Sequence, residues 1–227
     1  MKILIVSATE KEILPLKNKL KIKTSEVCIM KYAGTKDFSI DFLVTGIGST
    51  LTTYALTKKI STKKYDLVVN TGIAGSFSTD LNIGDVVNVM SDEFADLGIE
   101  DRNNFFTLFE KGFIKKDEPP FIDCKLWNPT EINLTLNKVS GITVNASHGN
   151  INSIELFKNK FGADIETMEG AAFFYVCLNE NVKFLQIRAI SNYVEERNNA
   201  NWDIPLAINN LNDKLFEIIN VIKNKGI

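Results

Sequence analysis

The chain has 227 residues, 44% of them hydrophobic and 24% charged, a composition typical of an ordinary globular protein that can bury a sizeable core. Its 26 basic and 28 acidic residues give a net charge of −2, which lacks the basic excess of proteins that bind nucleic acid or anionic membranes, so we expect neither partner. The cysteines Cys28, Cys124 and Cys177 form no close pair and leave an odd number, so we expect reduced thiols in a cytoplasmic protein.

Six continuous apolar runs predict strands that are buried on both faces. Each run ends in small or polar residues, as in sheets that helices cover on both sides. The runs span residues 2–8, 41–48, 66–75, 84–91, 141–147 and 182–191. The first run is followed by the acidic letters EKE and not by a small-residue cleavage site, so we interpret it as a strand and not as a signal sequence. No run approaches the length of a membrane span.

Helical patterns lie between these runs, at residues 50–61, 153–161, 169–180 and 204–225. The last of them places six apolar residues on one stripe: Ile204, Ile208, Leu211, Leu215, Ile218 and Ile222. Alternating strands and helices predict a three-layer α/β fold with a largely parallel sheet. No linker rich in Pro, Gly or Ser divides the chain, so we expect a single domain over residues 1–227.

Residues 92–137 form the least regular segment, with the letters KKDEPPF at its centre. A long irregular insertion in a compact domain is often a substrate loop or an interface.

Two glycine turns follow predicted strands, in the letters TGIGST and TGIAGS. Ligands of open α/β sheets bind beyond the carboxyl ends of the strands, where these turns lie. Neither turn completes G-x-G-x-x-G, and no G-K-[ST] occurs, which excludes a Walker loop. The glycines serve either tight turns and helix packing or a flat ligand that lies against bare backbone.

Polar side chains at the same strand ends are the candidate site. Glu10 and Glu12 follow the first strand, either as first-turn helix residues or with one of them activating a water. Glu169 begins a helix, where the helix dipole favours a carboxylate, and its small neighbours predict an enclosed group that two vicinal sugar hydroxyls would satisfy. His148 is the only histidine, so no metal site is expected, and a pocket or core role is favoured over a catalytic one.

Three motifs resemble the purine nucleoside phosphorylase and nucleosidase superfamily: NTGIAGSFSTDLNIGDVV (70–87), ETMEGAAFFYVC (166–177) and RAISN (188–192). They occur in that superfamily's order and spacing, and the resemblance covers essentially the whole chain. It implies a nucleoside phosphorylase-like three-layer αβα sandwich around a twisted, mixed but mostly parallel sheet. Together with the apolar residues 105–113, it also leads us to expect a homodimer.

Within the superfamily the chain is similar to the hydrolytic branch, which includes the methylthioadenosine/adenosylhomocysteine nucleosidases. By that resemblance Glu12 is the general base for a water at C1′ of the sugar, and Met168 and Glu169 grip the ribose. The backbone that lies against the base belongs to Ala74, Gly75 and Ser76. The ligand implied is a purine nucleoside, with no metal and no organic cofactor.

Asn192 departs from the pattern of that branch, which has an Asp here to protonate the departing adenine. A protonated acid matches adenine, which has an acceptor at N7 and a donor at its 6-amino group. A 6-oxopurine has acceptors at both N7 and O6, to which an amide NH₂ can donate as negative charge accumulates. Asn192 therefore indicates hypoxanthine or guanine as the leaving base. The alternative is an inactive paralogue, which the retained Glu12, Met168 and Glu169 disfavour.

Among nucleosidases for 6-oxopurines, the chain most resembles the futalosine hydrolases, through the letters SNYVEERNNANW and TVNASHG. That family releases hypoxanthine from futalosine and leaves dehypoxanthinylfutalosine, a step in menaquinone biosynthesis. The 5′ arm of futalosine carries an aromatic ring and a carboxylate. We expect aromatic residues and cations to line the pocket of this arm: Phe105, Phe106, Trp202, Arg102 and Arg197.

Three alternatives stay open. The first is a methylthioadenosine/adenosylhomocysteine nucleosidase. The second is a purine nucleoside phosphorylase, disfavoured because the position of that family's phosphate-binding Arg reads Val69-Asn70-Thr71 here. The third is a nucleoside-binding sensor without enzymatic activity.

Overall fold

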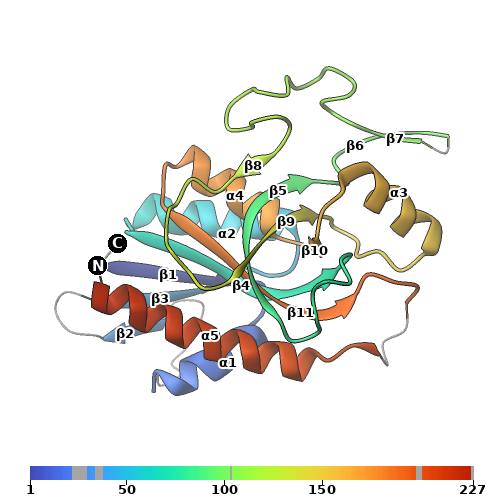
Figure 1. Ribbon diagram of the computed structural model, residues 1–227. Helices are drawn as coiled ribbons and strands as arrows, with labels where there is room; N and C mark the ends of the chain where they lie inside the picture. Colours follow the sequence, from blue (N-terminus) through green and yellow to red (C-terminus); the bar gives the residue numbers. More distant parts are fainter. Residues whose placement is uncertain (22–29, 34–37, 103, 198–200, 226–227) are drawn as a thin grey trace.

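The computed structural model describes residues 1–21, 30–33, 38–102, 104–197 and 201–225 (Figure 1). Its helices and strands follow in chain order: β1 (Lys2–Ser7), α1 (Glu10–Lys19), β2 (Met30–Ala33), β3 (Ser39–Val44), α2 (Ser49–Thr62), β4 (Leu67–Ser76), β5 (Val86–Phe94), β6 (Gly98–Asp101), β7 (Asn104–Thr107), β8 (Leu126–Trp127), β9 (Asn137–Thr143), α3 (Ile151–Phe161), β10 (Ile165–Thr167), α4 (Gly170–Asn179), β11 (Phe184–Tyr193) and α5 (Ile204–Lys225).

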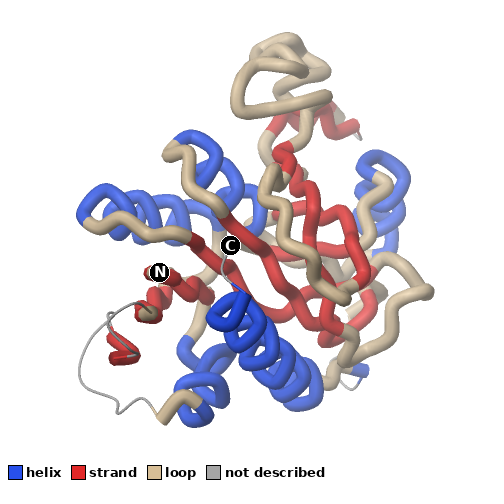
Figure 2. The backbone as a smooth tube through the Cα atoms, turned by 60° about the vertical axis from the view of Figure 1, so that its left-hand side comes forward, coloured by secondary structure: helices blue, strands red, loops and turns tan. Residues whose placement is uncertain are grey.

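The main sheet has nine strands in the order β10-β9-β5-β11-β4-β1-β3-β2, with β8 paired to β5. It is mixed, because β1, β3, β4 and β11 are parallel neighbours whereas β5 runs antiparallel to β11. Strand β10 pairs with β9 and also with β4, so that β4, β11, β5, β9 and β10 close into a ring. The sheet is therefore curled at one end, as the tube drawing shows (Figure 2). The sequence did not predict this closure.

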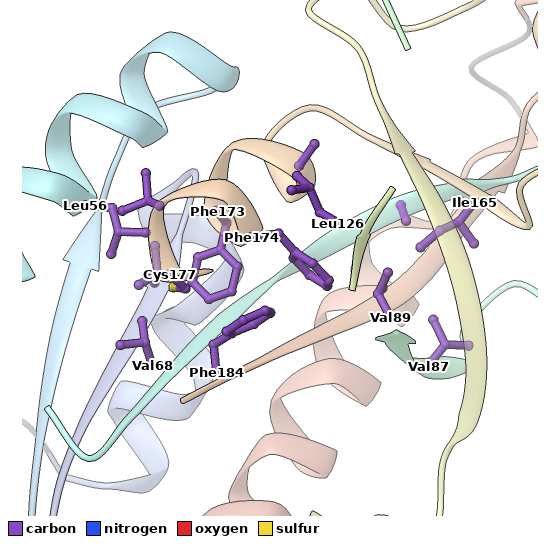
Figure 3. Close-up of a cluster of buried hydrophobic side chains, with 14 of the residues drawn as sticks. Leu56, Val68, Val87, Val89, Leu126, Ile165, Phe173, Phe174, Cys177 and Phe184 are labelled. Carbon is purple, nitrogen blue, oxygen red and sulfur yellow. The ribbon is translucent and has the colours of Figure 1, made fainter. Parts of the chain in front are cut away.

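Helices cover both faces of the sheet because the side chains of its central strands alternate. In β1, Leu4 and Val6 belong to a buried cluster that includes side chains of α2 and α4 (Figure 3). Ile3 and Ile5 point the other way, into a cluster with side chains of α1 and α5. A strand whose two faces are both buried must be apolar throughout, which explains the continuous apolar runs. The predicted α/β fold is confirmed.

The predicted elements correspond to observed ones with three corrections. The run 41–48 is a strand only as far as Val44, where β3 ends, and residues 45–48 lead into α2. The run 141–147 is not one strand, because β9 ends at Thr143 and the chain then leaves the sheet, where the backbone N–H of Asn145 donates to Asp96 at 2.5 Å. Residues 92–137 are not wholly irregular, because they contain the hairpin β6–β7 and the short strand β8. The stripe on α5 divides: Leu211, Leu215, Ile218 and Ile222 are buried in the core, whereas Ile204 and Ile208 line a cavity.

Two further expectations concern thiols and membranes. Cys124 and Cys177 carry free thiols, and Cys28 lies outside the described residues. Within the described parts of the chain, the search for a helix with the length and apolarity to cross a membrane finds none.

Candidate functional site

A cavity of about 370 Å³ lies at the carboxyl ends of β1, β4 and β11. Its volume falls in the range of pockets that hold small ligands. Several predicted site residues line it together: Glu12, Ala74, Gly75, Met168, Glu169, Asn192, Arg197 and Trp202. The carboxyl ends of parallel strands meet at one edge of a sheet, so residues far apart in the chain converge there.

Glu12 lies in the first turn of α1, with its side chain buried at the cavity. Its Oε2 accepts hydrogen bonds from the backbone N–H of Thr9 (2.8 Å) and from the Thr9 hydroxyl (2.9 Å), and its Oε1 accepts from the N–H of Ile73 (3.2 Å). Burial raises the pKa of Glu12, and the nearby Arg188 opposes this rise. A buried carboxyl whose pKa is raised is suited to accept a proton near neutral pH.

Glu10 occupies the same helical turn but points away from the cavity. Its carboxylate pairs with Lys17 at 2.7 Å and is about half exposed. Of the two glutamates that follow the first strand, only Glu12 can therefore act on a ligand in this cavity.

Glu169 is the N-cap residue of α4 and is 5% exposed, so the expected enclosed carboxylate is present. Its Oε1 accepts a hydrogen bond from the backbone N–H of Gly48 at 3.1 Å. Its Oε2 lies 3.5 Å from the Nη1 of Arg188. A carboxylate has about four acceptor positions, so Glu169 retains capacity for hydroxyl donors of a ligand.

Arg188 is a site residue that the sequence reasoning missed. Its side chain is 1% exposed within β11, between Glu12 and Glu169, and its Nη1 also lies 3.5 Å from the carbonyl oxygen of Ile73. Its Nε and Nη2 find no acceptor among the described residues. A buried donor without a partner is rare and marks a place where function overrides packing. The sequence feature that could have identified it is its place as a charged residue inside the apolar run 182–191.

Gly72 provides the space for this charge cluster. A Cβ atom on Gly72 would lie 2.4 Å from the Nη1 of Arg188 and 2.6 Å from the Oε1 of Glu12. Both side chains therefore pack directly on the bare backbone of β4, which explains one glycine of TGIAGS. This segment was expected to be a turn but is the last part of β4.

Asn192 faces the cavity because β11 carries a bulge. The register between β11 and β4 shifts between Ile190 and Asn192, which places Asn192 opposite Gly75. The Ser191 hydroxyl donates to Asn192 Oδ1 (2.8 Å), which orients the amide. Asn192 Nδ2 donates one hydrogen to the carbonyl oxygen of Tyr193 (2.9 Å), and its second hydrogen is free for a ligand.

Glu166 is a second residue of the site that the sequence reasoning missed, and unlike Arg188 it lines the cavity. It is 5% exposed in the short strand β10, which the sequence did not predict. Its Oε1 accepts from the backbone N–H of His148 at 3.0 Å, and its Oε2 contacts the Nδ1 of the same residue. His148 lines the cavity too and packs on Phe157, with 4.2 Å between ring centroids. The expectation that His148 is a pocket residue is confirmed.

Four predicted site residues lie outside the cavity: Ser76, Arg102, Phe105 and Phe106. Ser76 is buried and donates to the carbonyl oxygen of Ser78 at 2.8 Å. Arg102 is exposed at the turn of the β6–β7 hairpin, and Phe105 in the same hairpin stacks on Phe157 at 5.6 Å. This hairpin pairs with no strand of the main sheet, and Figure 1 shows it beyond α3. The assignment of Arg102 and Phe105 to an arm pocket therefore receives no support from this chain alone.

Phe106, Arg197 and Trp202 complete the predicted set. Phe106 packs against Lys111 in the hairpin, with the ammonium nitrogen 3.7 Å from the ring centroid. Arg197 and Trp202 both line the cavity, and the guanidinium carbon lies 5.6 Å from the Trp202 ring centroid. The cavity also contains Lys11, which the sequence reasoning did not single out.

The chain matches a family model and curated proteins in sequence. A family model with the description Phosphorylase superfamily matches residues 2–222. A futalosine hydrolase from Acidothermus cellulolyticus is 31% identical over 176 residues, which cover 75% of this chain and 71% of that protein.

Solved structures match the fold along nearly the whole chain, among them two from Helicobacter pylori. The Helicobacter pylori 5′-methylthioadenosine/S-adenosyl homocysteine nucleosidase superposes with a TM-score of 0.81 at 19% identity, covering 97% of this chain and 98% of that chain. The native structure of futalosine hydrolase of Helicobacter pylori gives a TM-score of 0.81 at 20% identity, with the same coverage of 97% and 98%. At such identities these structures show a shared fold.

Gly72→Ala tests the packing of the charge cluster. The added methyl group should force Arg188 and Glu12 apart, and overpacking of this kind lowers the free energy of unfolding by about 1–3 kcal/mol. Chemical denaturation of the variant and the wild type measures the difference. Equal stability would show that the two side chains move aside freely and that Gly72 is not required by them.

Proposed function

The chain belongs to the phosphorylase superfamily, and from this membership and the cavity we propose that it hydrolyses the N-glycosidic bond of futalosine. The products are hypoxanthine and dehypoxanthinylfutalosine, and the reaction is a step of menaquinone biosynthesis. The observation that carries the proposal is the amide of Asn192, which faces the cavity with a free N–H. The similarity to the Acidothermus cellulolyticus futalosine hydrolase supports the same substrate.

Glu169 binds and orients the ribose in this mechanism. The glycosidic bond breaks through an oxocarbenium-like sugar, and hydrogen bonds to the sugar hydroxyls that strengthen in the transition state assist cleavage. The buried carboxylate of Glu169 accepts from the 2′ and 3′ hydroxyls with the acceptor positions that Gly48 and Arg188 leave free. Met168 lines the same part of the cavity and packs against the sugar.

Glu12 is the general base that removes a proton from the attacking water. The carboxylate is buried, and its raised pKa brings its basicity closer to the working pH. Arg188 lies beside Glu12, and no described residue accepts from its Nε and Nη2, so it can donate a hydrogen bond to the same water. Its positive charge also offsets the negative charge of the Glu12 carboxylate. No step requires a metal or an organic cofactor.

Asn192 stabilises the leaving base. As the bond to C1′ breaks, negative charge collects on N7 and O6 of hypoxanthine, and a positioned amide donor stabilises that charge. Ser191 holds the amide oxygen, so that the NH₂ group and not the oxygen is available to the base. The backbone at Ala74 and Gly75 provides the surface on which the base lies.

The 5′ arm of futalosine carries a carboxylate that needs a cation. Arg197 and Lys11 are the cations among the described residues that line the cavity, and Trp202 offers an aromatic surface beside Arg197. We propose that one of these two cations binds the arm, and we no longer propose Arg102.

We further propose a single domain that works as a cytoplasmic homodimer with a three-layer αβα arrangement. Side chains at and just before α2 support the dimer, because Ile47, Leu51 and Tyr54 are 54%, 51% and 68% exposed. Exposed apolar side chains that lie together often mark an interface. Light scattering that gives a monomer at micromolar concentration would refute the dimer.

Chromatography of reaction mixtures tests the function. Futalosine, inosine, methylthioadenosine and adenosylhomocysteine are each incubated with the protein, with and without phosphate. We expect hypoxanthine from futalosine at a rate that phosphate does not change. A phosphate-dependent rate would indicate a phosphorylase, faster cleavage of the adenine nucleosides would indicate the other nucleosidase, and binding without release of base would indicate a sensor.

Glu12→Gln should reduce turnover by on the order of a hundred- to ten-thousand-fold, because an amide cannot accept the proton of the water. Gln also serves in capping boxes, so α1 should stay intact. Burial raises the pKa of Glu12 above its usual 4.5, and the carboxylate is the active form. The wild-type kcat/KM should therefore fall as the pH drops through that raised pKa, and this fall should be absent from the variant.

Glu10→Gln is the matched control for this experiment, since it changes the same helical turn outside the cavity. Its kcat should equal that of the wild type. Near-normal turnover of Glu12→Gln would show that Glu12 is only a capping residue.

Asn192→Asp should depress cleavage of futalosine relative to its adenine analogue, aminofutalosine. An ionised Asp would oppose the acceptors N7 and O6, whereas a protonated Asp would match the adenine edge. A site built on polar matches discriminates by several orders of magnitude when a partner is unpaired. The measurement is the ratio of the two specificity constants in wild type and variant, and an unchanged ratio would mean that the base is read elsewhere.

A further inference from the structure

We propose that Glu166 determines base specificity by accepting a hydrogen bond from the N1–H group of a 6-oxopurine. This inference rests on the proposed function and deepens it, because it names the second group that reads the base. Asn192 then supplies a donor to one edge of the purine, and Glu166 supplies an acceptor to another edge.

The sheet places these two residues on either side of a bare backbone position. Gly75 of β4 pairs with Asn192 of β11 on one side and with Glu166 of β10 on the other. Directly paired residues of neighbouring strands point to the same face of a sheet. Gly75 has no side chain, and the Cγ2 of Val194 lies above it, 2.8 Å from where a Cβ would stand, so a flat base would lie against this methyl group between the two polar groups. All three residues line the cavity.

The spacing of the strands suits a purine. Neighbouring strands lie about 4.8 Å apart, so Glu166 and Asn192 are separated by roughly 10 Å across Gly75. A purine that accepts at N7 and donates at N1 fits this span with one hydrogen bond at each end, because these two nitrogens lie on opposite sides of the ring system. A Cβ on Gly75 would lie 3.2 Å from Asn192 Nδ2, which shows that the amide stands on the face where the base would lie.

Glu166 retains acceptor capacity for a ligand. Its two oxygens contact the backbone N–H and the Nδ1 of His148, which uses two of about four acceptor positions. Because an ionised carboxylate only accepts, the Nδ1 of His148 carries a hydrogen in this arrangement. The remaining positions of Glu166 can therefore be satisfied by a donor in the cavity, and an acceptor placed there would be repelled.

His148 is a positioning residue that holds the carboxylate in place. Its ring packs on Phe157 at 4.2 Å, and Phe157 in turn stacks on Phe105 at 5.6 Å. Through this contact the β6–β7 hairpin supports the base end of the cavity, although Phe105 does not line it. Two hydrogen bonds and an aromatic stack leave Glu166 little freedom to turn away.

The pair of groups selects 6-oxopurines over adenine by donor and acceptor matching. Hypoxanthine has a hydrogen on N1, which the Glu166 carboxylate accepts. Adenine has a lone pair on N1, which would face the negative carboxylate and offer it no hydrogen where hypoxanthine offers one. Loss of a hydrogen bond to a buried charged group lowers the affinity by on the order of tenfold or more.

Calorimetric titration of the full-length protein with free bases tests this inference apart from catalysis. We expect the wild type to bind hypoxanthine about 10- to 100-fold more tightly than adenine or 1-methylhypoxanthine, which lacks the N1 hydrogen. In Glu166→Gln the advantage over both bases should shrink at least about tenfold, because a neutral amide can donate as well as accept. Asn192→Asp should leave the discrimination against 1-methylhypoxanthine in place, because it acts on the other edge.

Glu93→Gln is the control, since Glu93 pairs with Lys125 at 2.8 Å outside the cavity, and its base affinities should match those of the wild type. Equal binding of hypoxanthine and 1-methylhypoxanthine by the wild type would overturn the inference even if Glu166→Gln does not fold. An unchanged preference in a folded Glu166→Gln protein would overturn it as well. Absence of hypoxanthine release from futalosine, together with the expected base preference, would instead refute the proposed function alone.

Discussion

The site depends on one buried positive charge, the guanidinium of Arg188, which lies between the carboxyl groups of Glu12 and Glu169. A buried charge is tolerated only with partners, and removing one partner of such a group typically costs about 3–5 kcal/mol. Each of the two acids therefore needs Arg188, and Arg188 needs them. Gly72 lets the charged side chains of Arg188 and Glu12 pack against β4, so the groups of the candidate site are also part of the packing of the sheet.

A second buried network fixes the helix that carries Glu169. Asp92 is fully buried and accepts from the Thr143 hydroxyl at 2.8 Å, and its burial raises its pKa to about 6. The Thr143 oxygen accepts from the backbone N–H of Ala171 at 2.7 Å, in the first turn of α4. A Cβ on Gly170 would lie 2.0 Å from Asp92, so helix and strand approach closely. The N-terminus of α4, where Glu169 stands, is thus anchored to the core.

The local sequence predicted an element correctly where a single physical requirement, such as burial, decided its residues. Burial on both faces requires continuous apolar residues, so most of the central strands could be predicted, and the 3.6-residue stripe located α5. Prediction failed where pairing decided the structure. The apolar run 141–147 leaves the sheet after Thr143, and the three residues of β10 are too few to show a period. The closure of β10 on β4 is a long-range pairing that no local pattern reports.

The sequence by itself determined that polar groups stand at the strand ends, because Glu12 and Asn192 follow apolar runs and Glu169 begins a helix, at places where a buried polar group must find a partner. It did not determine which of these groups meet. Arg188 and Glu166 were overlooked because the sequence does not show which residue a single charged side chain in an apolar segment will contact. Only the tertiary structure decided that Glu166 and Asn192 flank the same glycine, since strands distant in the chain become neighbours only when the sheet curls and closes.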